Sequence, residues 1–436
     1  MKLSNNRFIK NTSWLLSGSI VRMLIQFVVS VLSVRYLGPS NFGVINYVAA
    51  YTAFFTALCG MGLNGIIISE FVNYREHDGE ILGTAVVMRL AVGVVSSLAF
   101  ILLMLLIDGS DKTIMMVTVL QAVQLPFCAF DTVKYWYQYQ LRSKHEVFIT
   151  TIGIVITSVY KACLLISKKG VEWFAFATSL DIILLAVMYL FSYHKHGIHP
   201  MVFSKDVAKR ILKACGPFIL ANIMVFIYGK IDTIMIKNIL ESTTLVGLYS
   251  AAITICGYIS FVPTAILDSA RPIVMNVKKK NEELYQIRFR QMSAGVLWIS
   301  ILYSLFISMF GEKIILLLYG GSYIGAVNSL KIAVWYTGFS YLGGVKSIWL
   351  ICENKNKYVF VLSAMGAATN ILLNLLLISP FGIEGAATAT LITQILSNMI
   401  YPAFFKETRG FAICAKDALL LRNIHLKTFL KEIRSN

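Results

Sequence analysis

Polar side chains recur at helical spacing inside one apolar run near the start of the chain. Ser19, Arg22, Gln26, Ser30 and Ser33 follow one another at steps of three or four residues, which places them on one face of a helix. Arg22 lies near the middle of this run, where a charge facing lipid would cost about 2.5–3.5 kcal/mol. It should therefore face the protein interior, where its planar guanidinium is suited to binding a phosphate through two hydrogen bonds.

Other apolar runs carry polar stripes of the same kind, and together they predict a wet, net-basic cavity that favours an anionic cargo. Arg89 and Lys161 lie nearer the ends of their runs, so headgroup contact by a snorkelling side chain is the alternative for both. The predicted substrate-binding residues, for a pyrophosphate and its sugars, are Arg22, Gln26, Arg89, Lys161, Lys230, Asn370 and Asn374.

Intramembrane acids form a second candidate set, for ion coupling or for salt bridges. It consists of Asp131, Asp181 and Asp232, together with Lys346. For Asp131 an interhelical salt bridge is as good an interpretation as function, and Lys230 and Asp232 could neutralise each other or pair with another helix. The sequence predicts no cofactor beyond a proton or sodium gradient as the coupling partner.

The sequence lacks the motifs of common enzyme and metal sites. Its seven cysteines are scattered, with no CxxC pair and no histidine at metal-ligand spacing, so we predict no metal site. No GxxxxGK[ST] motif is present, which excludes a P-loop ATPase. The six histidines lie mainly in loops predicted to be cytoplasmic, so we expect no catalytic residues and no enzyme.

The composition requires a membrane. Of 436 residues, 57% are hydrophobic and 14% charged, against about 25% charged in soluble domains. The formal net charge is +17, and the basic residues lie mainly in loops between the apolar runs. Membrane topology therefore explains this charge better than nucleic-acid binding does. Apolar runs of about twenty residues fit the bilayer core. They predict an all-α protein with about twelve spans, at about 12–34, 42–68, 83–107, 113–135, 147–167, 171–193, 209–236, 244–267, 289–310, 325–351, 357–379 and 383–405.

The basic loops set the expected orientation and domains. Most Lys and Arg residues fall in cytoplasmic segments when the N-terminus is inside, so both termini are expected in the cytoplasm of a multi-pass inner-membrane protein. The segment 417–434 mixes apolar and basic residues like a helix lying on the anionic inner leaflet, with a frayed tail as the alternative. The predicted domains are an N-terminus (1–11), an N-lobe (12–193), a linker (194–208), a C-lobe (209–405) and a basic amphipathic tail (406–436).

The two halves resemble each other in sequence. The segments beginning at Trp136 and Trp349 share Trp, Lys and Gly at equal offsets, and LIS–GVE at 165–172 matches LIS–GIE at 377–384. Six spans per half is an even number, so the halves enter the membrane in the same sense. We therefore predict two six-helix lobes related by a pseudo-twofold axis along the membrane normal, with a site between them and transport by alternating access.

Several segments resemble those of bacterial polysaccharide repeat-unit (O-antigen) flippases of the multidrug/oligosaccharidyl-lipid/polysaccharide exporter superfamily. They are NTSWL at 11–15, YLGPSNFG at 36–43, KID at 230–232, VGLY at 246–249 and GIEGAA at 382–387. The resemblance extends through about residue 405. The bulkier start of span 6, GVEW at 170–173, departs from the small-residue start of span 12.

The resemblance implies a substrate and partners. Such proteins carry an undecaprenyl-pyrophosphate-linked oligosaccharide from the cytoplasmic to the periplasmic leaflet for O-antigen, lipopolysaccharide or related surface polysaccharide biosynthesis. The lipid bilayer, and in some cases a polysaccharide polymerase and a chain-length regulator, would be the partners. Two alternatives remain. A drug or small-molecule antiporter of the superfamily would favour an acidic cavity, and a membrane polysaccharide polymerase or ligase would need a larger periplasmic loop.

Overall fold

The structure, a computed structural model, describes residues 2–140, 142–197, 199–278 and 281–422. Every regular element in these ranges is a helix, which confirms the all-α prediction. The chain divides into two compact units, Met1–Lys230 and Ile231–Asn436. This division falls inside helix α9 (Lys205–Leu240), later than the linker predicted at 194–208, and the predicted domain boundaries remain predictions.

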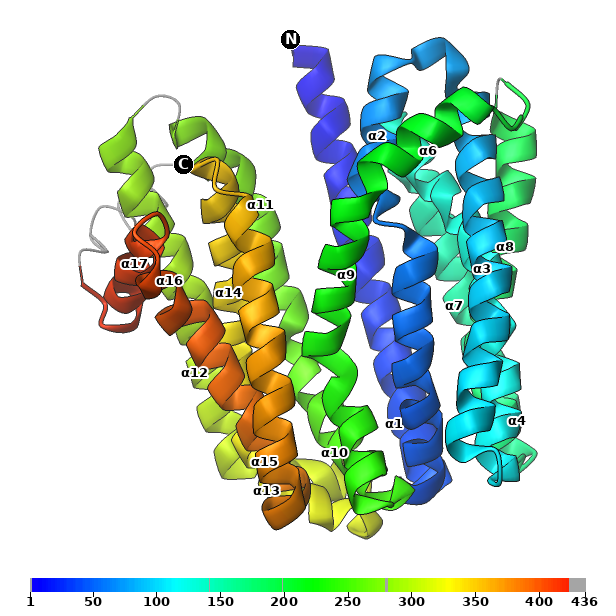
Figure 1. The fold of residues 1–436 in the computed structure, drawn as a ribbon, viewed down its shortest axis with the longest axis vertical. Helices are drawn as coiled ribbons and strands as arrows, with labels where there is room; N and C mark the ends of the chain where they lie inside the picture. Colours follow the sequence, from blue (N-terminus) through cyan, green and yellow to red (C-terminus); the bar gives the residue numbers. More distant parts are fainter. Residues whose placement is uncertain (1, 141, 198, 279–280, 423–436) are drawn as a thin grey trace. The chain divides into compact units, whose positions relative to one another are not determined.

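The first unit is built from long helices that run beside one another (Figure 1). Helix α1 packs against α3, α4 and α7, while α8 packs against α4 and α7. The elements are α1 (Lys2–Gly60), α2 (Leu63–Asn73), η1 (Arg75–His77), α3 (Asp78–Asp108), α4 (Lys112–Ala122), α5 (Gln124–Phe127), η2 (Cys128–Thr132), α6 (Val133–Tyr139), α7 (Ser143–Ile166), α8 (Val171–His196) and the first part of α9.

The second unit is also a helical bundle, in which α12 packs against α11, α13, α14 and α17. After the end of α9, its elements are α10 (Thr243–Gly257), η3 (Tyr258–Ser260), α11 (Phe261–Lys278), α12 (Glu282–Leu318), η4 (Gly321–Ala326), α13 (Val327–Ala333), α14 (Tyr336–Cys352), α15 (Lys357–Ile395), η5 (Leu396–Ile400), α16 (Tyr401–Phe404) and α17 (Arg409–Leu419).

Two glycines join helices that the sequence treats as separate spans. Gly38 has φ 70° and ψ 169°, and Gly382 has φ 60° and ψ −137°, conformations that are essentially restricted to glycine. Each is adjacent to or near a proline, Pro39 or Pro380. The chain changes direction at these points without an intervening loop, so spans 1 and 2 merge in α1 and spans 11 and 12 merge in α15.

Within the described residues, eight helical segments are long and apolar enough to cross a membrane. Two of them, Arg22–Gly60 and Lys357–Phe404, contain the glycine kinks and so combine two expected spans each. The chain is thus a multi-pass membrane protein, and the count of twelve spans remains a prediction.

The tryptophans of the sequence repeat lie at corresponding places in the two units. Trp136 lies three residues before the last residue of α6 and is fully buried, and Trp349 lies three residues before the last residue of α14 and is 5% exposed. Each belongs to the main apolar core of its own unit. The repeat therefore marks a shared packing position in each bundle.

The segment between α8 and α9 is tied to the first unit. The Asp78 carboxylate accepts a hydrogen bond from Trp136 Nε1 at 2.8 Å and pairs with His199 Nδ1. The Val202 amide donates to the Gly79 carbonyl at 3.3 Å. These contacts fix the connection to the start of α3.

Helix α17 is amphipathic, but it lies earlier in the chain than the predicted surface helix. Its buried face consists of Phe411, Cys414, Ala415 and Ala418. Its exposed stripe consists of Arg409, Ile413 and Lys416. The amphipathic prediction for 417–434 falls mostly beyond residue 422, outside the described residues.

Candidate functional site

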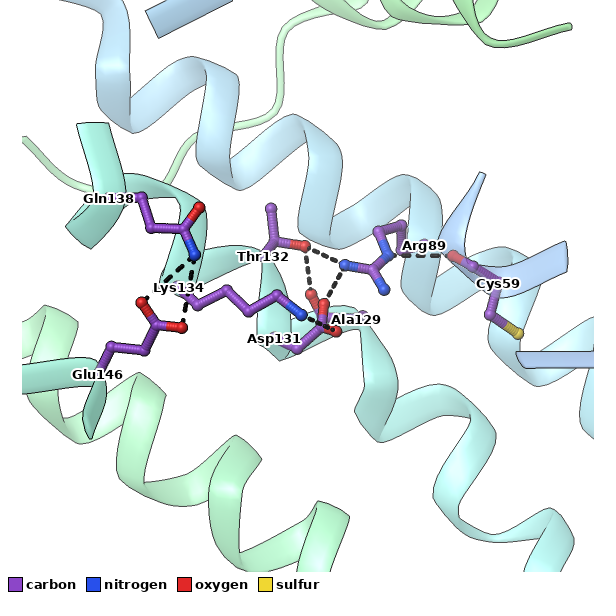
Figure 2. A network of polar contacts seen from close by, with 8 residues as sticks. All are labelled: Cys59, Arg89, Ala129, Asp131, Thr132, Lys134, Gln138 and Glu146. Atoms are coloured by element: carbon purple, nitrogen blue, oxygen red, sulfur yellow. Dashed lines mark hydrogen bonds and ion pairs between the residues drawn. The ribbon is translucent and has the colours of Figure 1, made fainter. Parts of the chain in front are cut away.

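A network of charged side chains lies inside the first unit and is centred on Arg89 (Figure 2). The Arg89 guanidinium donates through Nε to the Cys59 carbonyl at 3.0 Å and through a terminal nitrogen to Thr132 Oγ1 at 2.7 Å. The same nitrogen forms an ion pair with the Asp131 carboxylate. Arg89 is buried, so the alternative in which it reaches the headgroups does not apply.

Local sequence explains why Asp131 and Thr132 reach Arg89. Pro126 cannot donate a helical hydrogen bond, and the helix gives way to the 3₁₀ turn η2 immediately after α5. Helix α3 approaches α5, just before this turn, closely at Gly93, where an added Cβ would lie 2.7 Å from Pro126 Cα. The broken span and the small residue together bring η2 against the face of α3 that carries Arg89.

The network continues from Asp131 with alternating charge. Lys134 Nζ donates to the second Asp131 carboxylate oxygen at 3.1 Å. On the neighbouring helix α7, Glu146 accepts two long hydrogen bonds of 3.4 Å from Gln138 Nε2, as Figure 2 shows. Glu146 is also close enough to Lys134 and Arg22 to interact with both electrostatically.

Arg22 forms the far end of this series. A terminal nitrogen of its guanidinium donates to Thr150 Oγ1 at 2.7 Å, and Thr150 lies one helical turn after Glu146 on α7. Arg22 is half-buried, whereas Gln26, the other predicted residue on this helix, is exposed. Ser19, from the same stripe, is outside the side chains that the structure describes.

Lys161 and Asp181 form a second polar group in the first unit. Asp181 on α8 accepts a hydrogen bond from Thr157 Oγ1 at 3.3 Å and interacts electrostatically with Lys161. Both Thr157 and Lys161 belong to the polar stripe of α7. The pair joins α7 to α8, and the common cavity predicted for these cations stays a prediction.

The second unit buries an anion among neutral donors. The Asp232 carboxylate accepts hydrogen bonds from Tyr249 at 2.8 Å, from Asn374 at 2.7 Å and from Thr390 at 2.5 Å. Asn374 also donates to Asn370 at 3.1 Å. The partners of Asp232 are therefore neutral groups from α10 and α15, and Lys230, two residues away, is exposed.

Lys346 lies on α14 and is buried beside η5, the turn that follows α15. Its Nζ donates to the Ser397 carbonyl at 2.9 Å and to Asn398 Oδ1 at 2.8 Å. These acceptors lie in η5, a short π-helix, and π-helical turns are frequent at functional sites. One polar face runs from the end of α15 into η5 and carries Thr390, Gln394 and Asn398 at steps of four residues. Thr390 contacts Asp232 at one end of this face, and Asn398 contacts Lys346 at the other.

The structure adds residues that sequence reasoning missed. Glu146, Thr132 and Tyr249 complete the two networks. The sequence does contain a signal for Glu146, because it lies four residues before Thr150 and so continues the polar stripe of α7. Glu146 was overlooked because it lies at the boundary of the predicted span, beside Lys144 and His145.

Comparison with known sequences assigns the family. Residues 8–275 match the family described as "Polysaccharide biosynthesis protein". The chain belongs to this family. The match covers the whole charged network of the first unit and the Asp232 segment of α9.

Two relatives agree with this family. The probable flippase AglR of Haloferax volcanii is 27% identical over 261 residues, covering 56% of this chain and 52% of AglR. The chain thus matches about half the length of that relative. The capsular polysaccharide biosynthesis protein CapF of Staphylococcus aureus is 21% identical over 416 residues, covering 92% of this chain and 99% of CapF.

Solved structures share the fold. The lipid II flippase MurJ in an inward closed conformation has a TM-score of 0.73 and 12% identity, covering 93% of this chain and 91% of MurJ. An inward-facing multidrug resistance MATE family transporter of the MOP superfamily has a TM-score of 0.63 and 15% identity, covering 91% of this chain and 99% of that chain. Together the comparisons show that the chain belongs to the polysaccharide biosynthesis protein family and shares its fold with these solved membrane transporters.

The two partners of the central ion pair should respond differently to mutation. The Arg89 side chain is 5% exposed and that of Asp131 is 37% exposed. Asp131→Leu leaves a buried guanidinium without its counter-charge, so we expect it to lower the free energy of unfolding by about 3 kcal/mol. Arg89→Met should cost less, because Asp131 keeps Lys134 and partial hydration. Thermal unfolding of the purified protein in detergent measures both.

The double variant provides the control for this pair. Removing both charges should recover part of the Asp131→Leu loss, because the buried Arg89 guanidinium no longer stands without its counter-charge. Equal losses for the two single variants, with simple additivity in the double variant, would contradict the unequal burial on which this expectation rests.

Proposed function

We propose that this protein is a flippase that moves undecaprenyl-pyrophosphate-linked oligosaccharide repeat units, of O-antigen or a related surface polysaccharide, from the cytoplasmic to the periplasmic leaflet by alternating access. The observation that carries the proposal is the charge series of the first unit, in which Arg22, Lys134 and Arg89 outnumber Asp131 and Glu146. An excess of cations inside an apolar bundle is costly unless it serves an anion.

The chemistry of the series fits a pyrophosphate. Arg22 offers a planar fork of donors and Lys134 a compact positive charge, the two kinds of group that bind phosphate oxygens. Both side chains are half-buried, so they are partly shielded from water while remaining accessible. The Thr150 and Thr157 hydroxyl groups on α7 are suited to sugar hydroxyl groups.

Membership of the polysaccharide biosynthesis protein family supports the same substrate class. In this proposal the polysaccharide units are built on a lipid carrier, which the protein moves across the membrane. The proposal places the protein in a bacterial inner membrane with both termini in the cytoplasm, as the distribution of Lys and Arg favours. A polysaccharide polymerase and a chain-length regulator are the proposed downstream partners.

Replacing Arg22 tests the substrate contact. Arg22→Ala should abolish surface polysaccharide while the protein remains in the membrane, because a charge-assisted contact to the pyrophosphate is lost. Arg22→Lys should be milder, because it keeps the charge without the bidentate fork. Polysaccharide is measured on cells that carry each variant as the sole copy, with membrane protein quantified in parallel.

Arg35 provides the matched control. It lies on the same helix α1 and is exposed, so Arg35→Ala should leave polymer formation unchanged. Normal polymer made by Arg22→Ala would remove Arg22 from the site.

We further propose that a proton or sodium gradient drives transport, with Asp232 as the coupling acid. Its carboxylate is surrounded by oxygen-bearing side chains, and the buried Asn374 Oδ1 has no hydrogen-bond partner among the described residues. Oxygen atoms of this kind suit a proton or a hard cation. The Asp131 carboxylate, by contrast, is engaged by two cations, so it is better explained as structural.

Gradient dependence tests this coupling. Collapsing the gradients with ionophores should stop polymer formation in cells with the wild-type protein. Asp232→Asn should stop it with the gradients intact, because the amide does not bind a proton or a cation in the same way. Asp268→Asn, an exposed acid in the same unit, is the control and should behave as wild type. Transport that continues after both gradients are collapsed would contradict coupling.

A further inference from the structure

Glu146 is a charged residue that the proposed substrate contacts leave unexplained. It begins the polar stripe of α7 and is half-buried. Its hydrogen bonds from Gln138 are 3.4 Å long, beyond the usual range of about 2.7–3.2 Å for an N–H donor. Asp131 differs sharply, because it forms an ion pair with Arg89 and receives a 3.1 Å hydrogen bond from Lys134. Glu146 is thus the loosely held anion of the series.

The position of Glu146 suits an anion that exchanges with a ligand. It lies near the two half-buried cations. Gln138, its hydrogen-bond donor, follows Lys134 by one helical turn on α6. Thr150, which accepts from Arg22, follows Glu146 by one turn on α7. Arg89, by contrast, is buried and fully engaged by Cys59, Thr132 and Asp131. Any phosphate reaching Lys134 and Arg22 would meet the Glu146 carboxylate as a competitor of the same sign.

We propose that Glu146 is a placeholder anion, which balances Lys134 and Arg22 in the empty transporter and yields them to the pyrophosphate of the substrate. This inference rests on the proposed function. Its physical basis is that cations in a low-dielectric bundle need a counter-charge both with and without substrate. The Glu146 carboxylate supplies that charge after the substrate leaves. Because only long hydrogen bonds from Gln138 hold it, the carboxylate moves away when the substrate binds again.

The proposal fixes the direction of an affinity change. Glu146→Gln keeps the shape of the side chain but removes the competing charge, so pyrophosphate should bind about tenfold more tightly. A residue that only supports the local fold, or that hydrogen-bonds the substrate, would instead weaken binding or leave it unchanged when replaced. The same variant should slow polymer formation in cells, because the empty state loses its counter-charge and the substrate is released less readily.

The experiment measures binding of inorganic pyrophosphate to the purified full-length protein in detergent by calorimetry at fixed ionic strength. The variants are Glu146→Gln, Lys134→Met and the double variant. Glu80→Gln is the matched control, because Glu80 is another acid of the first unit and contacts a basic side chain, His77 at 3.3 Å, away from the series. We expect tighter binding for Glu146→Gln, weaker binding for Lys134→Met, no gain in the double variant and wild-type binding for Glu80→Gln.

A second substitution covers the case in which Glu146→Gln does not fold. Glu146→Asp withdraws the carboxylate by one methylene, so it should give a smaller gain of the same sign. A short-chain phosphatidylglycerol, added in place of pyrophosphate, separates the two sources of phosphate. A gain as large for this headgroup as for pyrophosphate would overturn the assignment of the site to pyrophosphate.

The outcomes separate the two proposals. Wild-type protein that binds pyrophosphate through Lys134, with no gain in Glu146→Gln or Glu146→Asp, would overturn the placeholder role and leave the flippase proposal standing. No pyrophosphate binding by any folded variant would contradict the proposed substrate contact, and the placeholder role with it.

Discussion

A charge inside a membrane bundle must be balanced, and this constraint governs the interior of both units. The first unit meets it by alternating charges, from Arg89 through Asp131 and Lys134 to Glu146 and Arg22. The second meets it with neutral groups, which surround Asp232 and Lys346 separately. Because desolvating an unpaired charge costs several kcal/mol, the breaks at η2 and η5 are best understood as ways to bring partners to these charges.

The two units therefore differ in chemistry although they share a sequence repeat. Trp136 and Trp349 occupy corresponding core positions, yet the first unit carries the excess of cations and the second the buried acid with neutral donors. In the proposed function the two units have different roles. The first unit would contact the pyrophosphate, and the second would bind the coupling ion.

The sequence predicts the helical class, the family and the face of each helix that is polar, because these depend on local periodicity. It also identifies Arg22, Arg89, Asp131 and Asp232 as interior charges. It does not predict their partners. Which cation meets Asp131 depends on the 3₁₀ turn after Pro126 and on the close approach at Gly93, and both are consequences of packing. Hydrophobic periodicity also does not predict that two pairs of spans merge into single helices, because Gly38 and Gly382 turn the chain without a loop.

Deleting the gene and following the lipid-linked oligosaccharide tests whether this protein moves it across the membrane. We predict that an undecaprenyl-pyrophosphate-linked oligosaccharide accumulates in the cytoplasmic leaflet of the deletion strain, as measured by mass spectrometry of extracted lipids and by protection from a periplasmic glycan probe. Restoring the wild-type gene should clear it. A deletion strain in which this intermediate does not accumulate, or in which it is fully accessible from the periplasm, would contradict the claim that this protein moves it across the membrane.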